Sequence, residues 1–294
     1  MTTLRSAVGR RGSAVPAVCA LGVGHEYEVS RLLDEDPFVN VALASRLTAA
    51  RSLTPAVLGG PMVGVRDRDG SLTAAVFNGG NLLPVGGDRD AWAQLARAVG
   101  DSRRCCTSIV GRAEAVAAMW PTLKTAWGAA REIRSEQPLL MIDNSPALPA
   151  GDPQVRRIRP DESERYLRAA AAMFTEELGI SPLLERNGVA YRRRIGALIA
   201  AGYAFGLVDD DGRILFKADV GALSSHTCQI QGVWVRPELR GQGIGTTALA
   251  AVIRHALELA PSVSLYVNYF NEPARRMYDR LGMRQVATLS TVLF

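Results

Sequence analysis

Three glycines at alternate positions stand out at residues 240–245, where the sequence is Arg-Gly-Gln-Gly-Ile-Gly. The residues before this loop, 228–235, are typical of a strand, and the apolar run from Thr246 to Leu259 is typical of a helix. Glycine lets the backbone approach a ligand closely, and the first turn of a helix adds positive partial charge. The segment therefore predicts a site for a phosphate or pyrophosphate group.

Other glycine-rich loops fit this segment less well. A Walker loop requires Gly-x-x-x-x-Gly-Lys-Ser/Thr, which does not occur in the chain. In a Rossmann loop, Gly-x-Gly-x-x-Gly, the third glycine would fall on Thr246. The chain also ends at Phe294, too soon for the rest of a dinucleotide fold. A plain turn from strand to helix remains an alternative, although such a turn needs only one glycine.

A second segment, 263–283, adds groups that could take part in chemistry. Residues 263–268 alternate as a strand does, and the following residues predict a helix with Asn271 as its N-cap and Gly282 at its end. Asn271, Ala274 and Tyr278 are spaced by three and four residues, so they share one face of that helix. Taken alone, Tyr278 is more typical of a core aromatic whose hydroxyl has found a partner.

The two segments together resemble the GCN5-related N-acetyltransferase (GNAT) family. The resemblance is carried by Val233-x-Val235-x-Pro237, by Arg240-x-x-Gly243-x-Gly245, and by Asn271-x-x-Ala274-x-x-x-Tyr278 leading into Leu281-Gly282-Met283. It covers about residues 230–283, and the elements before it fit the same fold back to about residue 155. The implied fold class is α/β with a mixed sheet, the acyl-CoA N-acyltransferase fold.

The resemblance implies acetyl-CoA as co-substrate and a set of residues that bind it. In the family, the pyrophosphate contacts the glycine-rich loop, and the pantetheine arm pairs with one strand edge like an added strand. The implied coenzyme-binding residues are Val233, Trp234, Val235, Arg240, Gly241, Gln242, Gly243, Ile244, Gly245, Thr246, Asn271, Ala274 and Tyr278. A bulge or splay at Gly232 is expected to open the wedge for this arm.

Two of these residues are also implied in catalysis, the direct attack of a neutral amine on the thioester. The backbone N–H of Val233 would donate to the thioester oxygen as negative charge develops there. Tyr278 would protonate the leaving thiolate, because a phenol with an ordinary pKa of about 10 stays protonated at neutral pH.

The general base is less well indicated. Gln229 occupies a position that holds a carboxylate in some family members, and an amide cannot take up the proton. Glu176 and Glu177 fall where the family builds its acceptor site, so we predict that they bind the acceptor. Asp219 and His226 are further candidates for the base, and water alone is an alternative to all four.

A proline-rich segment at 143–153 predicts a linker, and we divide the chain there into residues 1–148 and 149–294. The N-terminal half has an order of elements like that of the family. However, its corresponding loop, 86–90, is Gly-Gly-Asp-Arg-Asp, which places two carboxylates where phosphates would lie. We interpret this half as a degenerate GNAT-like domain, or an unrelated α/β domain, without a coenzyme site. The whole chain resembles two-domain actinobacterial acetyltransferases with an uncharacterised N-terminal domain.

Hydrophobic periodicity gives the expected elements. In the first half we expect helices at 38–50, 89–99 and 113–127, and strands at 62–66, 72–77, 81–85 and 105–110. In the second half we expect helices at 161–174 and 188–201 and strands at 155–158, 203–208, 212–220, 227–235 and 285–294, besides those already described. The N-terminus, with Arg5, Arg10 and Arg11 before an apolar stretch at 14–23, suggests a loose tail leading into a first strand.

Composition bounds the remaining alternatives. The net charge is +5, 48% of the residues are apolar and 21% are charged, which is typical of a soluble globular protein. The four cysteines have no metal-site spacing, so we expect no metal and a cytoplasmic location. No apolar run is long enough to span a membrane. The basic residues are spread out, so we expect neither a nucleic-acid nor a membrane partner.

The favoured function is an acetyl-CoA-dependent N-acetyltransferase whose amine acceptor is a small molecule or a protein. A non-catalytic acyl-CoA sensor and an acyltransferase acting on a hydroxyl group are the alternatives, because a fold alone does not decide between them. Self-association as a homodimer stays open.

Overall fold

The computed structural model describes residues 17–143, 148–184 and 187–294, so the N-terminal arginines of the expected tail lie outside the described residues. The N-terminal half carries five helices, α1 (Glu26–Asp34), α2 (Val41–Ala50), α3 (Pro55–Leu58), α4 (Arg89–Gly100) and α5 (Ala113–Trp127), in its described part. Its strands there are β1 (Ala17–Leu21), β2 (Met62–Arg66), β3 (Leu72–Asn78), β4 (Asn81–Gly86), β5 (Ser108–Arg112) and β6 (Glu132–Asp143).

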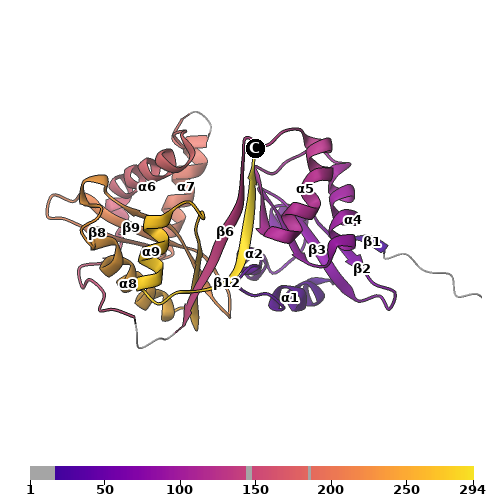
Figure 1. Ribbon diagram of the computed structural model, residues 1–294, viewed down its shortest axis with the longest axis horizontal. Helices are drawn as coiled ribbons and strands as arrows, with labels where there is room; N and C mark the ends of the chain where they lie inside the picture. The colour runs from indigo at the N-terminus through magenta and orange to yellow at the C-terminus, as the bar shows by residue number, and fades with distance from the viewer. Residues whose placement is uncertain (1–16, 144–147, 185–186) are drawn as a thin grey trace, which may run out of the picture.

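The C-terminal half repeats this kind of arrangement (Figure 1). Its described helices are α6 (Ser163–Leu178), α7 (Asn187–Ala200), α8 (Ile244–Leu257) and α9 (Glu272–Arg280). Its described strands are β7 (Arg156–Arg157), β8 (Ala204–Val208), β9 (Ile214–Leu223), β10 (Cys228–Val235), β11 (Ser262–Tyr266) and β12 (Arg284–Leu293).

All these strands form one sheet in which the two halves exchange their last strands. The order is β1-β2-β3-β4-β5-β12-β6-β11-β10-β9-β8-β7. β12, from the C-terminal half, pairs with β5, while β6, from the N-terminal half, pairs with β11. Figure 1 shows β6 and β12 side by side between the halves, where they pair along most of their length. Each half therefore completes the sheet of the other.

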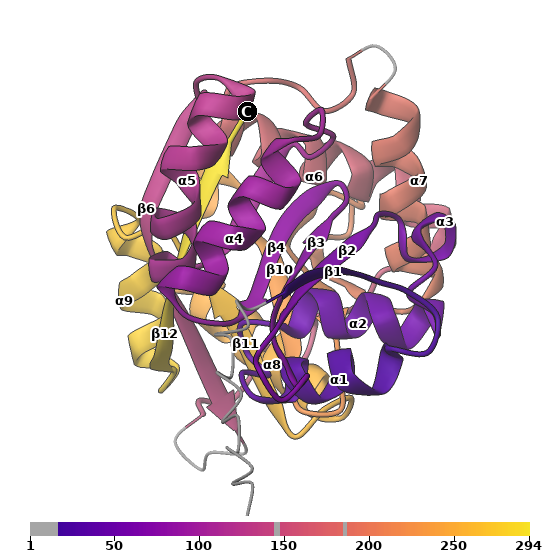
Figure 2. The ribbon, with the colours of Figure 1, turned by 90° about the vertical axis from the view of Figure 1, so that its right-hand side faces the viewer.

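Helices cover both faces of the sheet, since its strands carry apolar side chains on both sides. In the N-terminal half, α1 to α3 pack on one apolar cluster and α4 and α5 on another, and Figure 2 shows α4 beside α5 and α1 beside α2. In the C-terminal half, α8 packs with Tyr278 of α9 on β8 to β11, while α6 and α7 pack with Trp234 in a separate cluster.

The predicted linker is in part packed against the C-terminal half. Residues 144–147 lie outside the described part of the chain. Further on, the guanidinium of Arg254 on α8 donates to the carbonyl oxygens of Leu148 and Pro149, and the N–H of Asp152 donates to the carbonyl of Thr247. A domain boundary at 148 remains a prediction, and strand pairing connects the two sides of it, because β6 pairs with β11 and β12.

Most expected elements are present, and some details differ. The strand expected at 105–110 begins only at Ser108, because Thr107 continues the turn with an N–H bond to Gly80. Helix α1 and strand β6 were not among our expectations. Among the described residues there is no helix long and apolar enough to cross a membrane, and no cluster of metal-ligating side chains.

Candidate active site

The strands β10 and β11 pair in parallel only at their beginnings and then separate. Their register consists of Cys228 opposite Val263 and Gln229 opposite Ser264. On its other side, β10 is bulged against β9, since Gly232 and one further residue face a single residue of β9. Gly232 has a positive φ of 62°, which favours glycine. The bulge and the splay predicted at Gly232 are thus both present.

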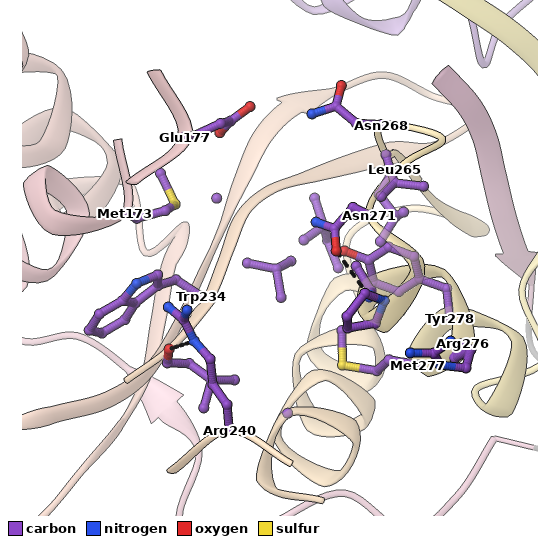
Figure 3. A pocket seen from close by; sticks show the side chains of 18 of the residues that line it. Met173, Glu177, Trp234, Arg240, Leu265, Asn268, Asn271, Arg276, Met277 and Tyr278 are labelled. Carbon is purple, nitrogen blue, oxygen red and sulfur yellow. Dashed lines mark hydrogen bonds between the residues drawn. The ribbon is translucent and has the colours of Figure 1, made fainter. Parts of the chain in front are cut away.

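A cavity of about 790 Å³ opens where these strands separate (Figure 3). It lies between β10 with the glycine-rich loop on one side and α9 with the preceding loop on the other. The lining includes thirteen of the fifteen predicted site residues: Val233, Trp234, Val235, Arg240, Gly241, Gly243, Gly245, Thr246, Asn271, Ala274, Tyr278, Glu176 and Glu177. Gln242 and Ile244 are not among the lining residues, and the amide of Gln242 turns back to the carbonyl of Glu238.

The glycine-rich loop ends in a helix N-terminus that no side chain caps. Gly243 is the N-cap of α8, with φ of 85° and nothing within 4 Å of the position of a Cβ atom. No hydrogen bond among the described residues uses the backbone N–H groups of Gly241, Gly243, Ile244 or Gly245. An anion at this point would therefore meet several free donors and the positive end of the helix.

In the N-terminal half, the N-terminus of the corresponding helix is capped by a side chain. There β4 and β5 pair in parallel only at Asn81–Ser108 and Leu82–Ile109, as β10 and β11 do. However, Asp88 caps the following helix α4, because its carboxylate accepts from the N–H of Ala91 at 2.9 Å. A carboxylate already occupies the place of an anion, which fits the interpretation of this half as one without a coenzyme site.

The opposite wall of the cavity is formed by α9. Asn271 caps this helix, as predicted, by accepting from the N–H of Ala274 at 3.3 Å. Tyr278 is 5% exposed, and burial raises the pKa of its hydroxyl above the ordinary value. That hydroxyl has no hydrogen-bond partner among the described residues. Every buried side-chain nitrogen or oxygen of those residues has a partner, so the hydroxyl of Tyr278 is not buried and reaches the cavity. A protonated phenol thus faces the cavity (Figure 3).

The two glutamates predicted to bind the acceptor both line the cavity, and both are ion-paired. Glu176 accepts from the guanidinium of Arg240 at 2.6 Å and from the indole N–H of Trp234 at 3.1 Å. Glu177 accepts from Arg134 at 2.7 Å. Since each carboxylate is held by an arginine, neither is a free proton acceptor in this arrangement.

The N-terminal half supplies part of the wall, which the sequence interpretation missed. Glu132, Arg134 and Gln137 of β6 line the cavity, and Arg134 bridges Glu132 and Glu177. The amide of Gln137 donates to the side-chain oxygen of Asn268, which precedes α9. The apolar run that follows Gln137 could have indicated a strand, but no local pattern indicates that this strand joins the other half.

Two of the four candidate bases lie outside the cavity. Asp219 is 3% exposed, and both of its oxygens are occupied, one by the hydroxyl of Tyr166 and the other by the ammonium of Lys217. His226 lies in the turn before β10, where its Nε2 is 3.1 Å from a carboxylate oxygen of Asp34 on α1. Neither residue lines the cavity, so neither position suits a direct base.

We expect Gly232→Ala to lower the free energy of unfolding by about 1–3 kcal/mol, since its φ is positive and unfavourable for a side chain. A Cβ atom there would lie 2.7 Å from Nζ of Lys217 and 3.0 Å from a carboxylate oxygen of Asp219. Thermal melting measures the change. The control is Gly196→Ala on α7, where a Cβ atom meets nothing within 4 Å and no loss is expected. Equal melting of the Gly232 variant and the wild type would contradict this prediction.

Two family models match parts of the chain. Residues 156–283 match the family model described as "Acetyltransferase (GNAT) family". Residues 60–166 match a "Domain of unknown function (DUF4081)", which extends past the boundary that we predicted. A mycothiol acetyltransferase from Acidimicrobium ferrooxidans is 30% identical over 165 residues. This match covers 52% of this chain and 50% of the relative, so the chain spans about half the length of that protein.

Solved structures with similar folds cover nearly the whole chain. A GCN5-related N-acetyltransferase from Sphaerobacter thermophilus is 17% identical, with a TM-score of 0.60, over 95% of each chain. A tandem GNAT protein from the clavulanic acid biosynthesis pathway is 16% identical, with a TM-score of 0.52, over 95% of this chain and 98% of that one. At these identities the likeness is one of fold, and it includes both halves.

Proposed function

We propose that this chain, whose residues 156–283 match the GNAT family model, moves an acetyl group from acetyl-CoA to an amine in the cavity of its C-terminal half. The observation that carries the proposal is the junction of three features in one cavity. These are the splayed edge of β10, the uncapped N-terminus of α8 and the hydroxyl of Tyr278 on the opposite wall.

The coenzyme would occupy the wedge from the helix N-terminus inwards. The free N–H groups of Gly241, Gly243, Ile244 and Gly245 suit a pyrophosphate. Arg240 also lines the cavity, where its guanidinium is paired with Glu176. The pantetheine arm carries amide groups, and it would pair with the edge of β10 that faces away from β9. This placement brings the thioester to Val233.

The reaction would then be a direct transfer. The lone pair of the amine attacks the thioester carbon, and negative charge develops on the oxygen beside the N–H of Val233. When the carbon–sulfur bond breaks, Tyr278 protonates the thiolate, while the new amide loses its extra proton to water. The phenolate of Tyr278 then regains a proton from solvent. We assign no protein base, because Glu176 and Glu177 are ion-paired and Asp219 and His226 lie elsewhere.

The acceptor would enter beside Glu176 and Glu177, where β6 of the N-terminal half also contributes to the wall. Three carboxylates and Arg134 are present at this end, and a charged or strongly polar amine matches them better than an apolar one. The similarity to a protein named mycothiol acetyltransferase makes the deacetylated form of mycothiol the first acceptor to test.

The experiment combines the purified full chain with acetyl-CoA and a panel of amines, including small polar amines and peptides. We expect release of free thiol that depends on one acceptor, together with an acceptor whose mass has increased by one acetyl group. If acetyl-CoA binds but no amine in the panel is acetylated, the sensor alternative is favoured instead. Product carrying the acetyl group on a hydroxyl would contradict the transfer to nitrogen.

A further inference from the structure

Two charged side chains are buried together beneath the bulge of β10. Lys217 is 0% exposed and Asp219 is 3% exposed, and both lie on β9, two residues apart. They alternate with Phe216, Ala218 and Val220, which pack on the α8 side, so they face the layer of α6 and α7. Burying a charge is costly unless it is paired, so this pair calls for an explanation.

Hydrogen bonds occupy both members of the pair. Nζ of Lys217 is 2.8 Å from one carboxylate oxygen of Asp219, and the hydroxyl of Tyr166 on α6 donates to the other oxygen at 2.5 Å. Nζ of Lys217 also donates to a backbone group, the carbonyl oxygen of Gly232, at 2.9 Å. Lys217 therefore joins the core of the C-terminal half to the bulge itself.

The carbonyl of Gly232 belongs to the same peptide unit as the N–H of Val233. A peptide unit is planar, and in the trans form its C=O and N–H point in opposite directions. At the bulge, two residues of β10 face one residue of β9, so the regular ladder does not fix this peptide. The ammonium of Lys217 fixes it instead, and the orientation of the Val233 N–H follows.

We propose that Lys217 is a positioning residue that, held by Asp219 and Tyr166, aims and polarises the Val233 N–H toward the thioester oxygen. This inference rests on the proposed function, since it assigns a task to that N–H. A cation on the carbonyl also strengthens the donor at the other end of the same peptide, because hydrogen bonds in a chain polarise one another. Lys217 itself does not line the cavity, so it acts through the peptide.

A purely structural role for the pair is the competing explanation. A hydrophobic pair of similar volume is often as stable as a buried ion pair. Stability alone therefore gives little reason for a lysine at this position. Gly232 supports the positioning role, because a Cβ atom there would lie 2.7 Å from Nζ, so the glycine makes room for the ammonium.

The test replaces both charges at once, with Lys217→Met and Asp219→Asn in one chain, so that no unpaired charge is left buried. The control is Lys124→Met, which changes the other lysine of the chain, exposed on α5. The first measurement is the infrared carbonyl stretch of bound acetyl-CoA, isotope-labelled at the thioester carbonyl. A hydrogen bond from Val233 lowers this frequency, so we expect it to rise in the double variant and to stay unchanged in the control.

Kinetics give the second measurement once an acceptor is identified. We expect kcat of the double variant to fall roughly tenfold or more, while KM for acetyl-CoA changes by less than about threefold. If the folded double variant keeps both the carbonyl frequency and kcat of the wild type, the positioning role is wrong and the pair is structural. If the wild type binds no acetyl-CoA at all, the proposed function fails and the inference fails with it.

Discussion

The Gly243→Asp variant is expected to lose acetyl-CoA binding, with an affinity reduced about hundredfold or more, while the chain stays folded. The added carboxylate would lie at the N-cap of α8, where it can accept from the N–H groups of the first turn. It would thereby remove the donors that we assign to the pyrophosphate and place a negative charge beside it. Isothermal titration calorimetry with acetyl-CoA measures the loss.

The N-terminal half shows the structural consequence of such a residue. Asp88 caps α4 at the corresponding loop from an extended backbone with φ of −119°, so a helix capped by its own aspartate is compatible with this fold. A Cβ atom at Gly243 meets nothing within 4 Å, so the new side chain would start in open space. The remaining cost is the positive φ of 85°, which an aspartate tolerates better than most residues do.

The control for that backbone cost is Gly70→Asp in the turn between β2 and β3. Gly70 has φ of 91° and equally open surroundings, and it lies outside the cavity. We expect this variant to bind acetyl-CoA as the wild type does. Unchanged affinity in a folded Gly243→Asp protein would remove the glycine-rich loop from the coenzyme site.

The Tyr278→Phe variant is expected to turn over about a hundredfold more slowly, a typical contribution of general acid–base catalysis. Burial raises the pKa of this phenol, so it is protonated at neutral pH, and we assign to it the proton that the thiolate takes up. Its hydroxyl has no partner among the described residues, and the substitution removes little volume, so folding and coenzyme affinity are expected to change little.

The effect on the chemical step is measured by single-turnover rates with an identified acceptor. The matched control is Tyr203→Phe, which changes a half-buried tyrosine that packs on the same core but does not line the cavity. Wild-type rates in the Tyr278 variant would make this residue a core aromatic, and the thiolate would then be protonated by water.

The C-terminal half could be predicted largely from sequence because its signals are local. The positive φ of Gly232, Gly243 and Gly282 follows from the need for glycine at a bulge, a helix start and a helix end. The cap by Asn271 also depends on residues close in the chain. Patterns among residues close in the chain were therefore enough to predict the glycine-rich loop, the helices of this half and the side of α9 that faces the cavity.

The parts that were missed depend on contacts between distant residues. Nothing near residues 132–143 indicates that β6 joins β11, because strand exchange is decided by the assembled sheet. For the same reason, the pairing of Arg134 with Glu177 could not be foreseen. Asp219 was considered as a base because its sequence position is compatible with one, but the ammonium of Lys217, two residues away, holds it in the core.

The number of acetyl-CoA molecules bound by one full-length chain tests the central claim most directly. In the C-terminal half, the helix that follows the first strand of the splayed pair, α8, has no side-chain cap, whereas Asp88 caps the corresponding helix α4 of the N-terminal half. Calorimetric titration of the wild-type chain is therefore expected to give one site per chain, and this site is expected to disappear in Gly243→Asp. Two equivalent sites, or one site that survives Gly243→Asp in a folded protein, would contradict the assignment.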